Sequence, residues 1–212
     1  MRTEMIDASI SSLVNTFGVR RPVAEGPLRR LFDAKDYVGM VRVIKTDICK
    51  DARIRLGLVN SGGGEKTAAK VVMPSPMPMY GTREFKQTLV TMYIKKSFLN
   101  VCTFEGAAAT IAHECAHIVL NSIGHPLRTS EEAVDMTAMI LGYRRLHIAS
   151  VEQIIETRAP LPKLSDDPIG YITGLFSPDR EITVRTFGYL SKEESDYAYR
   201  LIERFESRIT RS

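Results

Sequence analysis

An apolar helical stretch that carries ionisable side chains constrains this chain more than any other feature. Residues 104–122 predict a helix that ends before Gly124, and apolar residues cover almost its whole circumference. A helix that is apolar all round is normally buried. Yet His113, Glu114 and His117 lie within it, and buried polar groups are costly unless they have partners. The fold must therefore enclose this helix and also supply partners for these side chains.

These side chains belong to the pattern His113-Glu114-Cys115-Ala116-His117. Residues four apart share a helix face, so His113 and His117 can present ring nitrogens to one metal ion at the roughly 2.0–2.1 Å that zinc requires. Glu114 is turned by about 100° around the helix from His113, where it can act as a base on water rather than as a ligand. The pattern predicts a zinc hydrolase centre. The alternative is a pair of partly buried histidines on a core helix that binds no metal.

A catalytic zinc takes a third protein ligand, and a second predicted helix, 131–146, offers one. Thr129 and Glu132 have capping-box spacing at its start, which gives Glu132 a local role and leaves Glu131 free to bind the metal. Glu132 is the alternative ligand. Asp135 shares a helix face with Glu131 and lies among apolar residues, so a partner is expected for it. We expect Asp135 to accept the second ring N–H of a ligating histidine.

The compound pattern, 113–117 followed by Glu131-x-x-x-Asp135, resembles the gluzincin clan of zinc metallopeptidases, which includes the thermolysin group and the CAAX-endopeptidase-like group. The resemblance spans only about residues 85–147 and assigns no subfamily. Ser130 stands where the thermolysin group usually has Asn. By this resemblance the metal ligands are His113, His117 and Glu131, the general base is Glu114, and the outer partner of a ligand is Asp135.

The resemblance implies hydrolysis of peptide bonds in a polypeptide substrate, with Zn²⁺ as cofactor and Glu114 as proton acceptor. Gluzincins usually add an oxyanion donor from a downstream Tyr, His or Arg. No motif identifies that donor here, and the candidates are Tyr143, His147 and Tyr171. A structural role is favoured for His147, and His125 is expected at the surface. The alternative function is a zinc-binding regulatory or interaction module whose peptidase site is gated or inactive.

The resemblance also implies an α+β, zincin-like fold. In it, a small antiparallel sheet packs on the active-site helix and the second ligand helix, with additional helices at both ends of the chain. Alternating apolar residues predict strands at 54–58, 69–73 and 89–95. The first two are interpreted as an antiparallel hairpin. The third is interpreted as the edge strand to which an extended peptide can add.

Other helices are predicted from apolar periodicity and capping residues. They are expected at 4–17, at 28–44 with an interruption at Gly39, at 151–158, and after Ser191, which has a capping-box partner in Glu194. Residues 1–50 are expected to form an N-terminal helical segment packed on a metallopeptidase domain of residues 51–212. The whole chain is expected to be one compact unit.

Composition limits the partners and the compartment. The net charge is +4 with a pI near 9.0, but no run of Lys and Arg marks a nucleic-acid site, so no nucleic-acid partner is expected. No apolar stretch is long enough to span a bilayer. The polar, acidic start of the chain is unlike a signal peptide, which favours a cytoplasmic location. The three cysteines, Cys49, Cys102 and Cys115, are expected as buried free thiols.

Overall fold

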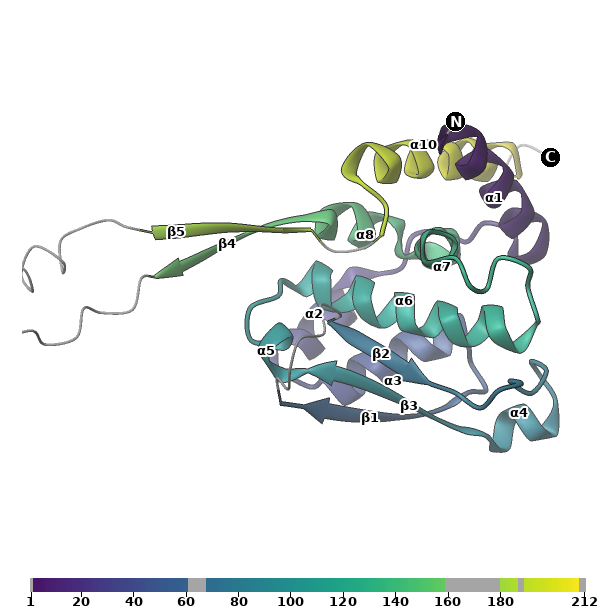
Figure 1. Ribbon diagram of the computed structural model, residues 1–212, viewed down its shortest axis with the longest axis horizontal. Coiled ribbons are helices and arrows are strands. Elements are labelled where there is room, and N and C mark those ends of the chain that lie inside the picture. Colours follow the sequence, from purple (N-terminus) through teal and green to yellow (C-terminus); the bar gives the residue numbers. More distant parts are fainter. Residues whose placement is uncertain (1, 61–67, 159–179, 187–188, 210–212) are drawn as a thin grey trace, which may run out of the picture.

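The computed structural model describes residues 2–60, 68–158, 180–186 and 189–209 (Figure 1). The helices are α1 (Arg2–Phe17), α2 (Glu25–Asp33), α3 (Tyr37–Ile48), α4 (Arg83–Gln87), α5 (Lys96–Leu99), α6 (Phe104–Ser122), α7 (Glu131–Ala138), the π-helical segment η1 (Met139–Tyr143), α8 (Arg144–Val151) and α10 (Lys192–Ile209). The strands are β1 (Arg53–Val59), β2 (Ala69–Val72), β3 (Leu89–Lys95), β4 (Glu152–Arg158) and β5 (Arg180–Thr186).

The fold is α+β, with a three-stranded sheet packed against helices on one side. In Figure 1, α6 crosses the middle of the molecule, the sheet lies below it, and α1 and α10 lie above it. Helices α3 and α6 contact each other, and they also contact β1 and β2 respectively. Within the described residues, no helix combines the length and the hydropathy needed to cross a bilayer.

The sheet is mixed, so the predicted antiparallel sheet and its hairpin are wrong. Its order is β1-β3-β2, with β1 parallel to β3 and β2 antiparallel to β3. The strand at 89–95, expected at the edge, is therefore the central strand. The side chains of Val90, Met92 and Ile94 are fully buried, and this burial favours the centre of the sheet. Periodicity identified all three strands but does not say which strands are neighbours.

One hydrophobic core includes residues from both ends of the chain. Ile10 of α1, Ile44 of α3, Ile111 of α6 and Ile202 of α10 all belong to the same cluster of buried side chains. Helices α1 and α10 lie side by side in Figure 1 and are in contact. The N-terminal helices therefore pack on the same core as the rest of the described chain.

The region at 28–44 forms two helices rather than one helix interrupted at Gly39. The chain turns at Lys35, which has a φ of 56°. Asp36 then caps α3, because its carboxylate accepts a hydrogen bond from the Gly39 amide at 2.8 Å. Gly39 therefore lies in the first turn of α3, where a side chain would collide with the capping carboxylate.

The second ligand helix also differs from its prediction in two respects. Its N-cap is Ser130 rather than Thr129, with the hydroxyl accepting a hydrogen bond from the Ala133 amide at 3.2 Å. The helix does not run straight to residue 146, because Gly142 has a φ of 108° within η1. Since this backbone conformation strongly favours glycine, the turn into α8 depends on Gly142.

The predicted helix at 151–158 is wrong, because residues 152–158 form strand β4. This strand pairs with β5 in an antiparallel hairpin that projects from the body of the molecule in Figure 1. A short run with adjacent β-branched residues, here Ile154 and Ile155, does not separate a strand from a helix by periodicity alone. Tyr171 lies outside the described residues.

Candidate metal centre

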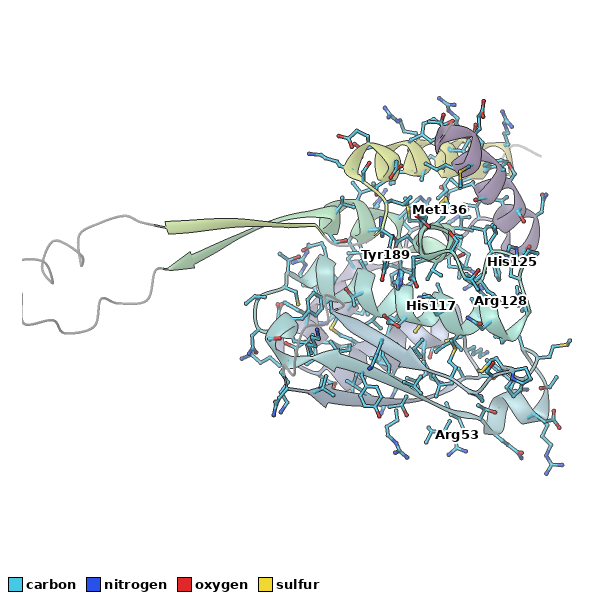
Figure 2. The ribbon with its side chains drawn as sticks, in the orientation of Figure 1. Arg53, His117, His125, Arg128, Met136 and Tyr189 are labelled. Atoms are coloured by element: carbon cyan, nitrogen blue, oxygen red, sulfur yellow. The ribbon has the colours of Figure 1, made fainter. Side chains whose placement is uncertain are left out.

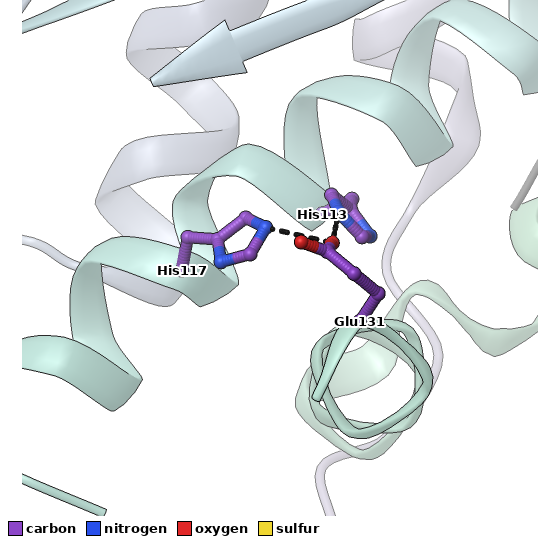
Figure 3. Close-up of side chains that lie close together, drawn as sticks. All are labelled: His113, His117 and Glu131. Atoms are coloured by element: carbon purple, nitrogen blue, oxygen red, sulfur yellow. Dashed lines mark hydrogen bonds and ion pairs between the residues drawn. The ribbon is translucent and has the colours of Figure 1, made fainter. Parts of the chain in front are cut away.

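Helices α6 and α7 bring the three predicted ligands together (Figure 3). His113 and His117 project from α6 towards Glu131, the first residue of α7. The Glu131 Oε2 atom lies 3.2 Å from His113 Nε2 and 3.1 Å from His117 Nε2. One potential ligand atom of each side chain lies within 4.8 Å of both others. The structure therefore places two imidazoles and a carboxylate around a single point.

These distances suit the donor set of a zinc site. Ligands at about 2.0–2.1 Å with tetrahedral angles lie about 3.3 Å from one another, close to the two nitrogen–oxygen distances observed. Two histidines and one carboxylate also form a common catalytic zinc set, which leaves a position open. The arrangement therefore fits zinc, with the His113, His117 and Glu131 side chains as holders.

The helix that carries the histidines is fixed at its start and along its buried face. The Thr103 hydroxyl caps α6 by accepting a hydrogen bond from the Gly106 amide at 3.2 Å. On α6, Cys115 is fully buried and hydrogen-bonds with the buried Cys49 of the α3 C-cap. Both thiols are free, as expected. The hydrogen bond with Cys49 and burial both raise the pKa of Cys115, so it is a core residue.

Asp135 orients His113 by contacting Nδ1, the ring nitrogen that does not face Glu131. Its Oδ1 atom lies 2.7 Å from His113 Nδ1, and its side chain is almost completely buried. Burial alone would raise the pKa of Asp135, but the hydrogen bond from His113 and the charges nearby lower it. A carboxylate in this position fixes the tautomer of His113 and directs Nε2 towards Glu131.

In the absence of a metal, the two histidines hold protons differently. Burial opposes the charged form of His113, but hydrogen bonds with Asp135 and Glu131 outweigh it and raise the pKa of His113 to about 10. Burial and the neighbouring His113 charge lower the pKa of His117. One proton on His113 therefore balances the nearby carboxylates, and a bound cation would take over that role.

Glu114 is buried beside the ligands without joining them. Its side chain is 5% exposed, and burial raises the pKa of its carboxyl group to about 7, although the charge of His113 opposes this shift. The carboxylate also accepts a hydrogen bond from the backbone amide of Val71 in β2. Glu114 therefore lies between the metal-ligand cluster and an edge strand, with a pKa suited to exchanging a proton near neutral pH.

No protein-family model matches this chain, and neither a curated protein nor a solved structure is similar enough to match it. Function is therefore inferred from the geometry of the centre.

Tyr189 is a further residue of the centre that the sequence did not reveal. Its ring stacks on His113, with ring centroids 5.5 Å apart and an angle of 20° between the planes. Its backbone amide donates a hydrogen bond to Asp135 Oδ2 at 2.7 Å. The side chain is 48% exposed and lies near α6 in Figure 2. No local motif marks this tyrosine, because the packing just before α10 brings it to the site.

Two predicted oxyanion-donor candidates have structural partners instead. The Tyr143 hydroxyl is part-buried and donates a hydrogen bond to Asp47 Oδ2 at 2.8 Å. His147 is buried, with Nε2 lying 3.5 Å from the Ser195 hydroxyl. Burial lowers the pKa of His147, while the charge of Asp135 opposes that shift. Neither residue belongs to the ligand cluster.

The remaining histidine and the alternative ligand also lie outside the cluster. His125 is buried, so the expected surface position is wrong. Its Nδ1 atom accepts a hydrogen bond from the Leu127 amide at 3.1 Å, which gives the ring a role in the loop between α6 and α7. The Glu132 carboxylate accepts a hydrogen bond from the Ser130 hydroxyl at 3.0 Å. Glu131 is therefore the carboxylate that approaches the histidines.

Proposed function

We propose that this chain is a zinc-dependent metallopeptidase of the zincin-like type. The observation that carries the proposal is the convergence of His113 Nε2, His117 Nε2 and Glu131 Oε2 beside a buried, unliganded carboxylate. A structural metal site is normally closed by four protein ligands. A set with an open position and an adjacent base favours hydrolysis.

When bound, zinc would polarise a water molecule and the scissile carbonyl group. The Glu114 carboxylate accepts the proton of the attacking water and later delivers it to the leaving amine. Burial raises the pKa of Glu114, and a group that accepts and returns a proton works best when its pKa lies near the working pH.

Asp135 and Tyr189 act on the geometry of this reaction. Asp135 holds the His113 N–H, so that Nε2 keeps a fixed direction. The Tyr189 ring stacks on the His113 ring and is exposed to solvent. Burial and the charges of Glu131, Glu114 and Asp135 raise the pKa of its hydroxyl. We assign the Tyr189 hydroxyl as the donor to the oxygen on which negative charge develops during peptide hydrolysis.

A polypeptide is the substrate that the surroundings favour. In the described chain, β2 has a strand neighbour on one side only, and its Val71 amide reaches Glu114. An extended peptide can add to such an edge by backbone hydrogen bonds. A peptide paired with β2 would run past Glu114, the proton acceptor. Because the pairing uses backbone hydrogen bonds, it would not require a particular side chain in the substrate.

The test is to compare the wild type with Glu114→Gln, a variant of nearly the same shape. Zinc content is measured after purification without added metal, and hydrolysis is measured on an unfolded protein. We expect one zinc per chain in both, with hydrolysis by the wild type and a loss of at least about 10²-fold in the variant. Absence of zinc, even after incubation with it, would contradict the proposal.

The alternative function gives a different result in the same experiment. Stoichiometric zinc without hydrolysis in either protein would favour a zinc-binding module with a gated or inactive site. The Tyr189→Phe variant, with its zinc content measured in parallel, serves as a control that the ligand cluster survives changes nearby.

A further inference from the structure

The three-stranded sheet has one face that no described helix covers. Strand alternation directs Val90, Met92 and Ile94 towards the helices, where they are fully buried. The alternate residues point the other way and form what we call the outer sheet face. The outer sheet face consists of Arg53, Arg55, Gly57 and Val59 of β1, Leu89, Thr91, Tyr93 and Lys95 of β3, and Lys70 and Val72 of β2. Figure 2 shows Arg53 at the lower edge of the molecule, away from α6.

Every charged residue in these three strands is basic. Arg53 and Arg55 project from β1, Lys70 from β2 and Lys95 from β3, and Arg53, Arg55 and Lys70 are exposed. These cations are distant in the sequence, which explains why no basic run predicted them. Strand pairing gathers them on one surface.

The nearest acidic residue at the start of β1 already has a partner. Asp51 lies before the strand and pairs with Lys86 Nζ at 3.6 Å. Asp51 and Lys86 both lie outside the outer sheet face. Strands β1, β2 and β3 contain cationic side chains and no acidic side chain.

An aromatic ring lies at the centre of this surface. Tyr93 is paired with Gly57 on one side and with Lys70 on the other. A Cβ atom at Gly57 would lie only 2.7 Å from Tyr93 Cδ1, so the ring lies directly over the backbone of β1. Any larger residue would push the ring outwards. Gly57 thus leaves room for one edge of the Tyr93 ring, and Arg55 and Lys70 lie on the strands beside it.

An aromatic ring among cations suits one class of polymer particularly well. Single-stranded nucleic acids are bound without strong sequence preference by basic surfaces that follow the phosphates and by aromatic rings on which bases stack. Sheet surfaces serve this purpose in several RNA-binding folds. A duplex hides the faces of its bases, and an acidic protein has no planar bases to stack.

We propose that the outer sheet face binds single-stranded nucleic acid, with Arg53 and Arg55 contacting phosphates and Tyr93 stacking on a base. This inference goes beyond the peptidase proposal and does not depend on it. The metal-ligand cluster lies on α6 and α7, on the opposite side of the sheet. A bound strand would therefore leave the cluster accessible.

The test uses the full chain and a fluorescently labelled oligothymidylate of about 20 nucleotides, with anisotropy measured between about 50 and 200 mM salt. The variant carries Arg53→Gln and Arg55→Gln together. We expect the wild type to bind, and the variant to lose at least about tenfold in affinity at the lowest salt. Because each phosphate contact on a single strand contributes about 0.7 to the slope of log K against log salt, the slope should fall by about 1.4.

The matched control removes the same charge from another surface. Arg200 and Arg204 are exposed on α10, which lies on the opposite side of the molecule from the sheet in Figure 1. The Arg200→Gln, Arg204→Gln double variant should bind like the wild type. No binding by the wild type, an unchanged affinity in the sheet variant, or an equal loss in the control would overturn the proposal.

Two further probes separate nucleic acid from other anions. An abasic oligonucleotide of the same length should bind at least about fivefold more weakly, because stacking of one base contributes about 1–3 kcal/mol. Equal affinity for the two oligonucleotides would overturn the proposal. So would a sheet variant that loses binding to phosphatidylserine vesicles but keeps its affinity for oligothymidylate, since the outer sheet face would then be a membrane surface.

Discussion

At the residue scale, Asp135 connects the metal-ligand cluster with the rest of the fold. One carboxylate oxygen accepts from His113 on α6, and the other accepts from the Tyr189 amide that precedes α10. The residue itself lies on α7. Orientation of the His113 ring therefore depends on segments that are far apart in the sequence, although Asp135 lies outside the candidate cluster of His113, His117 and Glu131.

Replacement of Asp135 by Asn should weaken zinc binding by about 10–100-fold. The neutral amide can still meet the Tyr189 amide through its oxygen, but it no longer provides a charged acceptor for His113. Competition with a chromophoric chelator measures this affinity. Glu132→Gln is the control, because the Glu132 carboxylate hydrogen-bonds to the cap residue Ser130 and is not part of the cluster of His113, His117 and Glu131. Equal zinc affinities for wild type and Asp135→Asn would show that the carboxylate does not orient His113.

Tyr189→Phe should separate catalysis from metal binding. The phenylalanine ring retains the stacking on His113, so zinc affinity should stay the same. Loss of the hydroxyl should lower kcat by about 10²-fold or more, which is typical of removing one oxyanion donor. Steady-state kinetics on a peptide substrate provides the measurement. A Tyr189→Phe variant with the kcat of the wild type would exclude the hydroxyl from the reaction. The zinc affinity of a Tyr189→Ala variant tests the stacking on His113 separately.

At the element scale, local capping signals predicted the start of α10 but misplaced the start of α7 by one residue. Thr103 caps α6, and Ser191 forms the predicted capping box of α10 with Glu194. The i, i+4 histidine pair is equally local, so the sequence predicted it. The position of Glu131 beside the histidines depends only on the packing of two successive helices, α6 and α7.

The pairing of strands and the docking of segments that are far apart in the chain could not be predicted from the sequence. The alternation of β1 and β2 identified strands, but β3 inserts between them, and that insertion depends on how the sheet packs on α3 and α6. Tyr189 reaches His113 for a similar reason, because its position depends on the docking of the C-terminal segment. Likewise, the residues of the outer sheet face cannot be grouped from the sequence before the strand order is known.

The turn within η1 is an element whose stability depends on one glycine. Gly142 has a φ of 108°, and a Cβ atom there would lie 2.7 Å from the Arg21 carbonyl oxygen. Gly142→Ala should therefore lower the free energy of unfolding by about 3 kcal/mol, from backbone strain and steric overlap together. Gly124→Ala is the matched control, since Gly124 has a φ of 62° but open space around it, and strain alone costs about 1–2 kcal/mol. Urea denaturation compares them, and an equal loss would contradict the role of the Arg21 contact.

At the scale of the whole molecule, the first and last helices, α1 and α10, form one layer above α6. The Tyr197 hydroxyl of α10 donates a hydrogen bond to Asp7 of α1 at 2.7 Å. Buried Arg144 of α8 donates to the Arg20 carbonyl at 2.8 Å and also pairs with Glu206 of α10. Since Asp135 contacts the segment before α10, this layer is continuous with the metal-ligand cluster. Metal binding should therefore stabilise the described fold as a unit.

Zinc should raise the melting temperature of the whole chain, because only the folded state brings α6 and α7 together around the ion. At a free zinc concentration 100-fold above Kd, the gain is about 2.7 kcal/mol, which corresponds to roughly 5–10 °C for a chain of this size. Scanning calorimetry with zinc and with a chelator measures the shift. His117→Gln should abolish it, whereas His125→Gln should retain it, since His125 is buried outside the cluster. A zinc-induced shift that survives in His117→Gln would place the metal elsewhere in the molecule.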